Sequence, residues 1–198
     1  MANRPKRSTL NKAAIIEKSG SLFLKKGYDR TSMRDIARSC GYEAGNIYNY
    51  FRNKEQLLYE VIKEETERFI SLIKHIEVDD ITNPVEQLRS LIEIHFNFIL
   101  GKKGGKLIFD KESKNLTPAH RKKIIESRDM WESIVRKIIR RGIDTGDFAE
   151  IDEKVVVYAL ASIIVRGRIW FSPKGRLSSN EIGDIISKII INGLKGRG

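Results

Sequence analysis

The chain has little of what disulfide-bonded, secreted or membrane proteins require. A single cysteine, Cys40, excludes an intrachain disulfide, and we expect it to fill a small position in a core. The longest nearly apolar run, residues 155–165, ends at Arg166 and is shorter than the roughly 18 residues of a membrane helix. The basic N-terminal residues are not followed by the apolar segment of a secretory signal. We therefore expect a cytoplasmic protein that does not associate with membranes.

Signatures of enzymes are also missing. The three histidines, His75, His95 and His120, are dispersed, and there is no H-E-x-x-H motif, nucleophile elbow or glycine-rich dinucleotide loop. We expect no catalytic residue, no metal and no cofactor. Because His95 falls on an apolar helix face, we expect a hydrogen-bonded core histidine rather than a base. An enzyme remains an alternative that turnover of a substrate would revive.

Negative charge is scarce at the N-terminal end. The chain carries 37 Lys and Arg against 26 Asp and Glu, a formal charge of +11. Residues 1–54 hold 12 of the basic and only 4 of the acidic residues. A basic excess of this kind favours a polyanionic partner.

The same basic region contains two short helical patterns separated by a glycine. Thr31 or Ser32 can cap a helix whose apolar face is Met33, Ile36 and Ala37. Gly41 permits the chain to reverse within a few residues. The second helix is expected over residues 44–50. The arrangement is that of a helix-turn-helix that enters a DNA groove.

The second helix of this motif has two contrasting sides. Ile47 and Phe51, four residues apart, are expected to point inward. The outward groups are small, amide or phenolic, and such groups can approach base edges and phosphates closely. They are Ala44, Gly45, Asn46, Tyr48 and Asn49.

The motif resembles the DNA-binding domain of the TetR family over about residues 11–60. The resemblance is carried by Gly27-Tyr28, residues 31–37, Gly41, residues 45–51 and Lys54. It implies a repressor with an N-terminal DNA-binding domain, and an all-α region behind it that dimerises and binds a small molecule. The DNA-binding residues that it implies are Thr31, Ser32, Tyr42, Gly45, Asn46, Tyr48, Asn49, Tyr50 and Lys54. Asn46 and Asn49 are expected to read bases, because an amide can pair with an adenine edge, and Tyr48, Tyr50 and Lys54 to contact phosphates.

The sequence departs from the family pattern in the turn and at the start of the second helix. Tyr42-Glu43 stands where a small apolar residue and a Ser or Thr cap are usual, and Asn46 replaces a common Thr or Ser. These departures bear on the operator sequence rather than on the fold.

The sequence pattern predicts helices in the rest of the chain. Apolar residues at helical spacing predict helices over residues 12–26, 54–76, 84–100, 118–143 and 152–170, and a last one after Ser178. Asn53, Asn83, Asp152 and Ser178 or Ser179 are the expected caps. The predicted fold is all-α with about nine helices. A three-helix helix-turn-helix domain over residues 1–53 is followed by a ligand-binding and dimerisation domain over residues 54–198.

The last two helices carry more apolar surface than a monomer of 22.7 kDa would expose. Pairing with their copies in a four-helix bundle would bury that surface. We therefore expect a homodimer through these helices, with two DNA-reading helices about 34 Å apart on a near-palindromic operator.

A ligand site is indicated by residues 166–170. Arg166 and Trp170 lie one turn apart, so a guanidinium and an indole N–H could together bind an anionic or carbonyl-bearing ligand. An Arg paired with a carboxylate at the dimer interface, beside a packing Trp, is an equal alternative.

This C-terminal region also resembles TetR-family repressors of fatty-acid and sterol catabolism, which respond to acyl-CoA thioesters. The resemblance implies an acyl-CoA effector and control of fatty-acid or lipid catabolism genes. The predicted ligand-binding residues are Phe96, Ile99, Trp131, Ile134, Tyr158, Ser162, Arg166 and Trp170. The alternatives are a TetR-type repressor of an efflux or other pathway with a different hydrophobic ligand, and a DNA-binding protein that ignores ligands.

Overall fold

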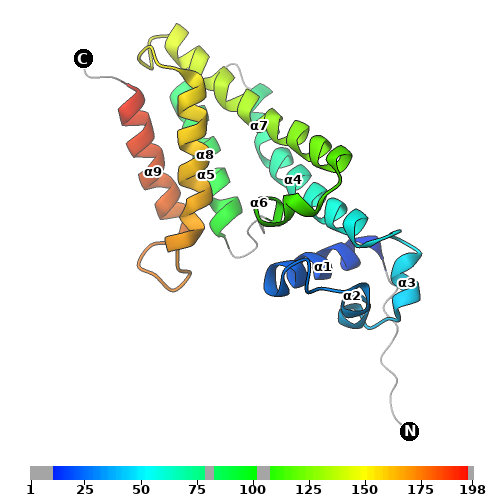
Figure 1. Ribbon diagram of the computed structural model, residues 1–198. Helices are drawn as coiled ribbons and strands as arrows, with labels where there is room; N and C mark the ends of the chain where they lie inside the picture. Colours follow the sequence, from blue (N-terminus) through cyan, green and yellow to red (C-terminus); the bar gives the residue numbers. More distant parts are fainter. Residues whose placement is uncertain (1–10, 79–82, 102–107, 196–198) are drawn as a thin grey trace. The chain divides into compact units, whose positions relative to one another are not determined.

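The computed structural model describes residues 11–78, 83–101 and 108–195 (Figure 1). These residues form nine α-helices and one short 3₁₀ helix, and no strand is found among them. The helices are α1 Lys12–Lys26, α2 Met33–Cys40, α3 Ala44–Tyr48, α4 Lys54–Val78, α5 Pro84–Leu100, α6 Ile108–Glu112, η1 Ser113–Asn115, α7 Pro118–Asp144, α8 Glu153–Trp170 and α9 Ser179–Leu194. The prediction of an all-α fold with about nine helices is confirmed.

The predicted capping residues explain where most of these helices begin. Asn53, Asn83, Asp152 and Ser178 each accept a hydrogen bond from a backbone N–H in the first turn of the helix that follows. Ser178 also forms a reciprocal capping box with Glu181. These hydrogen bonds lower the pKa of the Glu181 carboxyl. Helix α6 was not predicted, and it follows residues 102–107, which lie outside the described residues.

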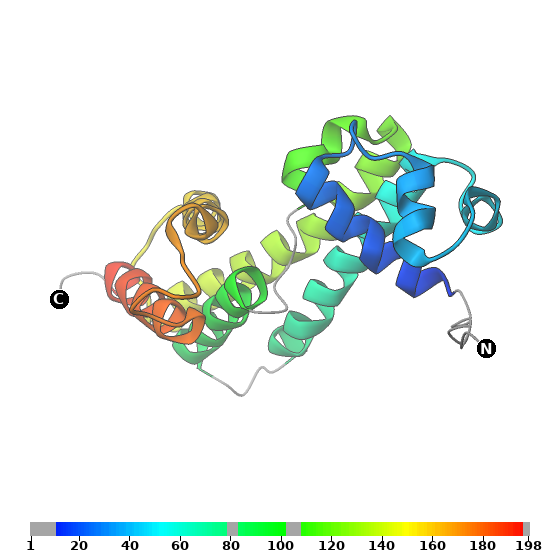
Figure 2. The ribbon, with the colours of Figure 1, turned by 90° about the horizontal axis from the view of Figure 1, so that it is seen from below.

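The chain forms two compact units, of which the N-terminal one is discontinuous in sequence. It comprises Met1–Glu65 together with Lys106–Ile124, and the other unit comprises Thr66–Gly105 with Ile125–Gly198. In the N-terminal unit α6 lies against α1, as Figures 1 and 2 show from two directions. Its core takes Ile108, Leu116 and Ile124 from the second segment. The functional boundary expected after residue 53 stays a prediction.

Polar contacts reinforce this association of distant segments. The buried carboxylate of Glu112 accepts hydrogen bonds from the Tyr28 backbone N–H at 3.2 Å and from Asn115 at 2.9 Å. The Glu55 carboxylate accepts from the Thr117 backbone N–H and contacts Nδ1 of His120, both at 2.8 Å. The His120 ring also stacks on Tyr59. The first turn of α7 is therefore fixed to the first turns of α4.

The C-terminal unit is organised around α5. Helices α8 and α9 both pack on α5 (Figure 1). The buried Gln87 of α5 donates to the Ile76 carbonyl at the end of α4, and it accepts from Arg141 of α7. Arg89 reaches Asp184 and Ser187 on α9. Within the described residues, no helix is long and apolar enough to cross a membrane.

Candidate DNA interface and effector site

The predicted helix-turn-helix is present, and local hydrogen bonds define its first helix. Ser32 rather than Thr31 is the cap of α2: its hydroxyl accepts from the Asp35 backbone N–H, and Asp35 accepts from the Ser32 backbone N–H at 3.0 Å. These bonds hold the pKa of the Asp35 carboxyl below its usual value. Gly41 ends the helix in the left-handed conformation, with φ of 77°, where a side chain would be strained. The position of this glycine in the sequence therefore determines where the turn forms.

Helix α3 is shorter than predicted, because it ends at Tyr48 rather than Tyr50. Ile47 and Phe51 are fully buried, as expected from their spacing. Glu43 occupies the cap position, but its side chain makes no capping hydrogen bond. The helix is thus held by the burial of two side chains rather than by its own termini.

The predicted DNA-binding residues separate into an exposed group and an interior one. The exposed or partly exposed side chains lie on α3, its flanks and the start of α2: Ser32, Tyr42, Gly45, Asn46, Tyr48, Asn49 and Tyr50. Thr31 differs, because it is 1% exposed and its hydroxyl donates to the Gly27 carbonyl. The structure therefore leaves all of the predicted DNA-binding residues except Thr31 exposed or partly exposed.

Lys54 is positioned by the preceding part of the same unit. Its ammonium group donates to the Tyr28 carbonyl at 3.0 Å and lies 4.1 Å from the centroid of the Tyr28 ring. Such contacts restrict the motion of the flexible lysine side chain. They do not neutralise its positive charge, which stays able to attract a phosphate. Sequence reasoning omitted Arg34 and Arg38, which are exposed on α2 and supply further positive charge.

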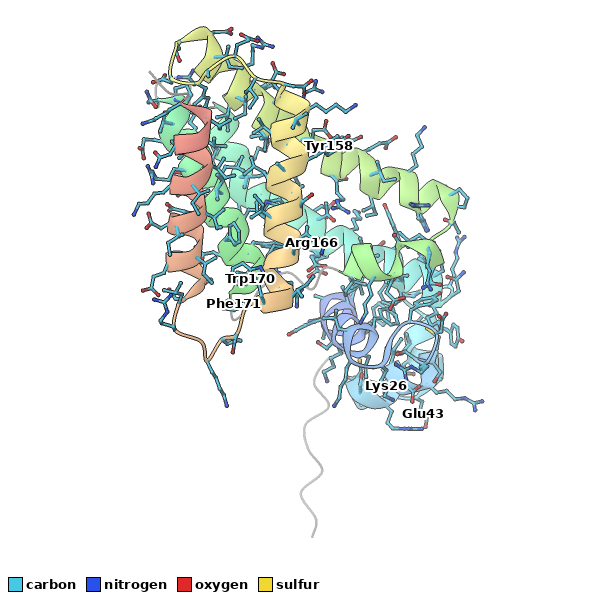
Figure 3. The ribbon with its side chains drawn as sticks, turned by 60° about the vertical axis from the view of Figure 1, so that its left-hand side comes forward. Lys26, Glu43, Tyr158, Arg166, Trp170 and Phe171 are labelled. Atoms are coloured by element: carbon cyan, nitrogen blue, oxygen red, sulfur yellow. The ribbon has the colours of Figure 1, made fainter. Side chains whose placement is uncertain are left out.

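The predicted ligand-binding residues fall into two sets that the structure does not bring together. Phe96, Ile99, Trp131 and Ile134, on α5 and α7, are buried. Tyr158, Ser162, Arg166 and Trp170 are exposed on α8, and the labelled ones lie along that helix from its first half to its end (Figure 3). Tyr158 and Trp170 are 54% and 57% exposed. The apolar members of the second set are available to a partner surface.

Other apolar side chains of α8 and α9 are exposed as well, and together with Tyr158 and Trp170 we call them the α8–α9 face. Val155, Ile169, Ile185 and Ile189 are also exposed, and Ile169 reaches 76%. Isolated apolar side chains are common on surfaces, but this number on two helices is typical of a protein interface. The face matches the dimer interface that the sequence predicts.

Trp131 of the buried set belongs to an aromatic cluster whose other members were not among the predicted ligand-binding residues. We define it as Phe69, His95, Phe98 and Trp131, from α4, α5 and α7 of the C-terminal unit. The prediction that His95 lies in the core is confirmed. Its Nδ1 has no hydrogen-bond partner among the described residues, and neither has the Trp131 indole nitrogen, so the hydrogen bond expected for this histidine is not found at Nδ1. Periodicity places a histidine on an apolar face, but it does not reveal its partners.

A separate hollow of about 490 Å³ lies on α7, lined by Asp129, Glu132, Ser133 and Arg136. It contains none of the predicted ligand-binding residues. Its mixed charges are unlike an apolar effector site.

The fold and the motif define a helical DNA-binding regulator with an appended all-α body, and comparison with known proteins specifies its family. Residues 15–61 match the model of bacterial regulatory proteins of the tetR family. Residues 82–194, more than half of the chain, match the model of the tetracyclin repressor-like C-terminal domain. The chain therefore belongs to the TetR family of transcriptional regulators.

Similar proteins are named as repressors and regulators rather than as enzymes. The chain is 25% identical to the HTH-type transcriptional repressor KstR2 of Mycolicibacterium smegmatis over 196 residues, covering 96% of this chain and 93% of KstR2. It is 27% identical to the fatty acid metabolism regulator protein of Bacillus subtilis over 136 residues, covering 69% of this chain and 70% of that protein.

Solved structures share the whole fold. AibR, in complex with isovaleryl coenzyme A and operator DNA, matches with a TM-score of 0.82 and 25% identity, covering 90% of this chain and 96% of AibR. The ketosteroid regulator KstR2 of Mycobacterium tuberculosis matches with a TM-score of 0.83 over 96% of this chain and 97% of KstR2. Because the identity to this KstR2 is only 22%, the match shows a shared fold and nothing more.

The burial of His95 predicts a loss of stability in acid. Burial, reinforced by the nearby Arg128 charge, lowers the pKa of His95 from 6.5 to about 3. Between these values the unfolded chain binds a proton that the folded chain does not, so the free energy of unfolding decreases as the pH falls. The decrease should approach about 1.4 kcal/mol per pH unit. Urea unfolding of the wild type and His95→Phe at several pH values checks this. Equal pH slopes in the two proteins would contradict it.

The placement of Lys54 predicts a general rather than a sequence-selective contact with DNA. Lys54→Ala should weaken binding to specific and unrelated DNA by similar factors and reduce the salt slope by about 1, because one phosphate contact is lost. Lys74→Ala, an equal charge change at an exposed position of α4 in the other unit, is the control. The measurement is a salt titration of affinity by fluorescence anisotropy. A changed sequence preference in Lys54→Ala would contradict this assignment.

Proposed function

We propose that this chain is a transcriptional repressor that binds a near-palindromic operator as a homodimer and is released by a fatty acyl-CoA. It acts in the cytoplasm on genes of fatty-acid or lipid catabolism. The observation that carries the DNA-binding part is the run of exposed residues on α3 and directly after it, with Asn46 in the helix and Asn49 and Tyr50 following it. Asn46 and Asn49 read bases, while Tyr48, Tyr50 and Lys54 contact phosphates.

Two kinds of relative support the effector class. AibR is described with isovaleryl coenzyme A and operator DNA together, and its fold covers nearly all of this chain. The Bacillus subtilis relative is named for fatty acid metabolism. The buried apolar residues Phe96, Ile99 and Ile134 offer an environment suited to an acyl chain.

Release follows from differential binding of the effector. The effector favours a conformation of the C-terminal unit in which the two DNA-reading helices of the dimer have the wrong spacing for the operator. Shifting a population from 1:99 to 99:1 requires a preference of roughly 10⁴-fold for the released state. A ligand that bound both states equally would release nothing. Helix α4 continues from the N-terminal into the C-terminal unit, as α7 also does, and α4 transmits the change.

A gel-shift titration on DNA from the chain's own upstream region tests the proposal. The purified protein should bind this DNA and lose it on addition of long-chain acyl-CoA. Free fatty acid and CoA, each alone, are the controls and should not release it, because neither carries the whole thioester. Binding that ignores all three compounds would refute the acyl-CoA effector and leave the DNA-binding function standing.

The α8–α9 face predicts the effect of a charge on assembly. Ile169→Asp should convert the dimer to a monomer, because two carboxylates would be buried across the two-fold axis without partners. Loss of the second half-site contact should weaken operator binding by roughly 10²-fold. Leu72→Asp, at an exposed apolar position of α4, is the control and should remain dimeric. Sedimentation velocity measures the assembly state. A dimeric Ile169→Asp would place the interface elsewhere.

A further inference from the structure

Two polar atoms inside the aromatic cluster have no hydrogen-bond partner among the described residues. They are Nδ1 of His95 and Nε1 of Trp131, and each residue is only 9% exposed. A buried polar atom left without a partner costs free energy on the order of 1–3 kcal/mol, and few native proteins retain several. A core that served only packing would hold apolar residues at both positions. Two such atoms in neighbouring rings therefore indicate a missing hydrogen-bond partner at this point of the core.

The geometry places the two rings close together and excludes most of the solvent. The His95 and Trp131 ring centroids are 5.3 Å apart, in an edge-to-face arrangement, and Phe69 lies 4.2 Å from His95. The rings come from α5 and α7, with Phe69 from α4. All three residues belong to the C-terminal unit. The two polar atoms thus belong to rings that meet where α4, α5 and α7 pack together.

The chemistry of the two groups defines what they can bind. An indole N–H only donates, so its partner must offer a lone pair. The lowered pKa keeps His95 uncharged at neutral pH, and an uncharged ring gives little compensation for burying a carboxylate. A carbonyl oxygen has two lone pairs and no charge, so it can accept from the indole N–H and from Nδ1–H of the imidazole together.

We propose that His95 and Trp131 form the carbonyl-binding subsite of the effector site. The inference rests on the proposed function, because it assigns the acyl end of the effector to this cluster. An acyl thioester or a ketone would present the same oxygen. Trp131 belonged to the ligand set predicted from sequence, and His95 is the residue that the structure adds. The subsite gives recognition of the carbonyl without any contribution from the exposed Arg166 and Trp170.

Calorimetric titration of the full-length protein with matched probes tests the subsite. Decanoyl-CoA is compared with its thioether analogue S-decyl-CoA, which lacks only the carbonyl oxygen, and 2-undecanone with undecane. Wild type should prefer the carbonyl-bearing member of at least one pair by about tenfold, the effect of a buried hydrogen bond. Trp131→Phe and His95→Phe keep an aromatic ring but remove the nitrogen, and each should bring the preference close to parity. His75→Phe, which removes an imidazole at an exposed position of α4 in the same unit, is the matched control and should keep it.

Operator binding without ligand separates this inference from the proposed function. Both subsite variants should bind operator DNA as tightly as wild type, which shows that they are folded and dimeric. If the CoA probes fail to bind but the ketone preference disappears in Trp131→Phe, the subsite stands and the acyl-CoA effector is refuted. If wild type shows no preference within either pair, or both variants retain it, the two nitrogens hold only water and the subsite is refuted.

Discussion

The burial of Ile47 and Phe51 is the constraint on which the DNA-reading surface depends. Helix α3 has five residues, far fewer than the roughly 12–15 that an isolated helix needs, and Glu43 provides no side-chain cap. Its position is therefore set by two side chains inserted into the core of the N-terminal unit. Because Asn46 lies next to Ile47 in α3 and Asn49 lies between Ile47 and Phe51 in the chain, the two buried anchors fix the backbone from which both amides project. Substitutions of the exposed outer residues leave these two anchors, and with them the packing of α3, in place.

The helices could be predicted from sequence because their signals are local. The caps at Asn83, Asp152 and Ser178 use an oxygen two or three residues from the N–H that it accepts from, so the sequence alone contains the whole interaction. Helix α6 was not predicted from the sequence, because five residues are too few to show a helical period. That the segment ending at Ile124 packs into the N-terminal unit was not predicted either. It depends on contacts such as Glu112 with Tyr28, which are 84 residues apart.

The sequence predicts those features of the candidate sites that depend on the spacing of residues along a helix. The inward and outward sides of α3 follow from the period of a helix, and the structure agrees with them. On α8, the same spacing places Arg166 near Trp170, but it does not distinguish a side that faces a pocket from one that faces another subunit. Only the packing of α8 on α5 separates these possibilities, by leaving Tyr158 and Trp170 exposed. The unpartnered nitrogens of His95 and Trp131 likewise became visible only with neighbours in place.

The discontinuity of the N-terminal unit has a consequence for synthesis on the ribosome. Its core includes Ile108, Leu116 and Ile124, and these residues emerge only after the whole of α5 has been translated. The helix-turn-helix cannot complete its core while it is the only part of the chain outside the exit tunnel. The N-terminal unit therefore cannot reach its native packing until the first turns of α7 have been made. A chain that terminated after Glu65 would carry the entire recognition motif and still expose part of the surface on which that motif rests.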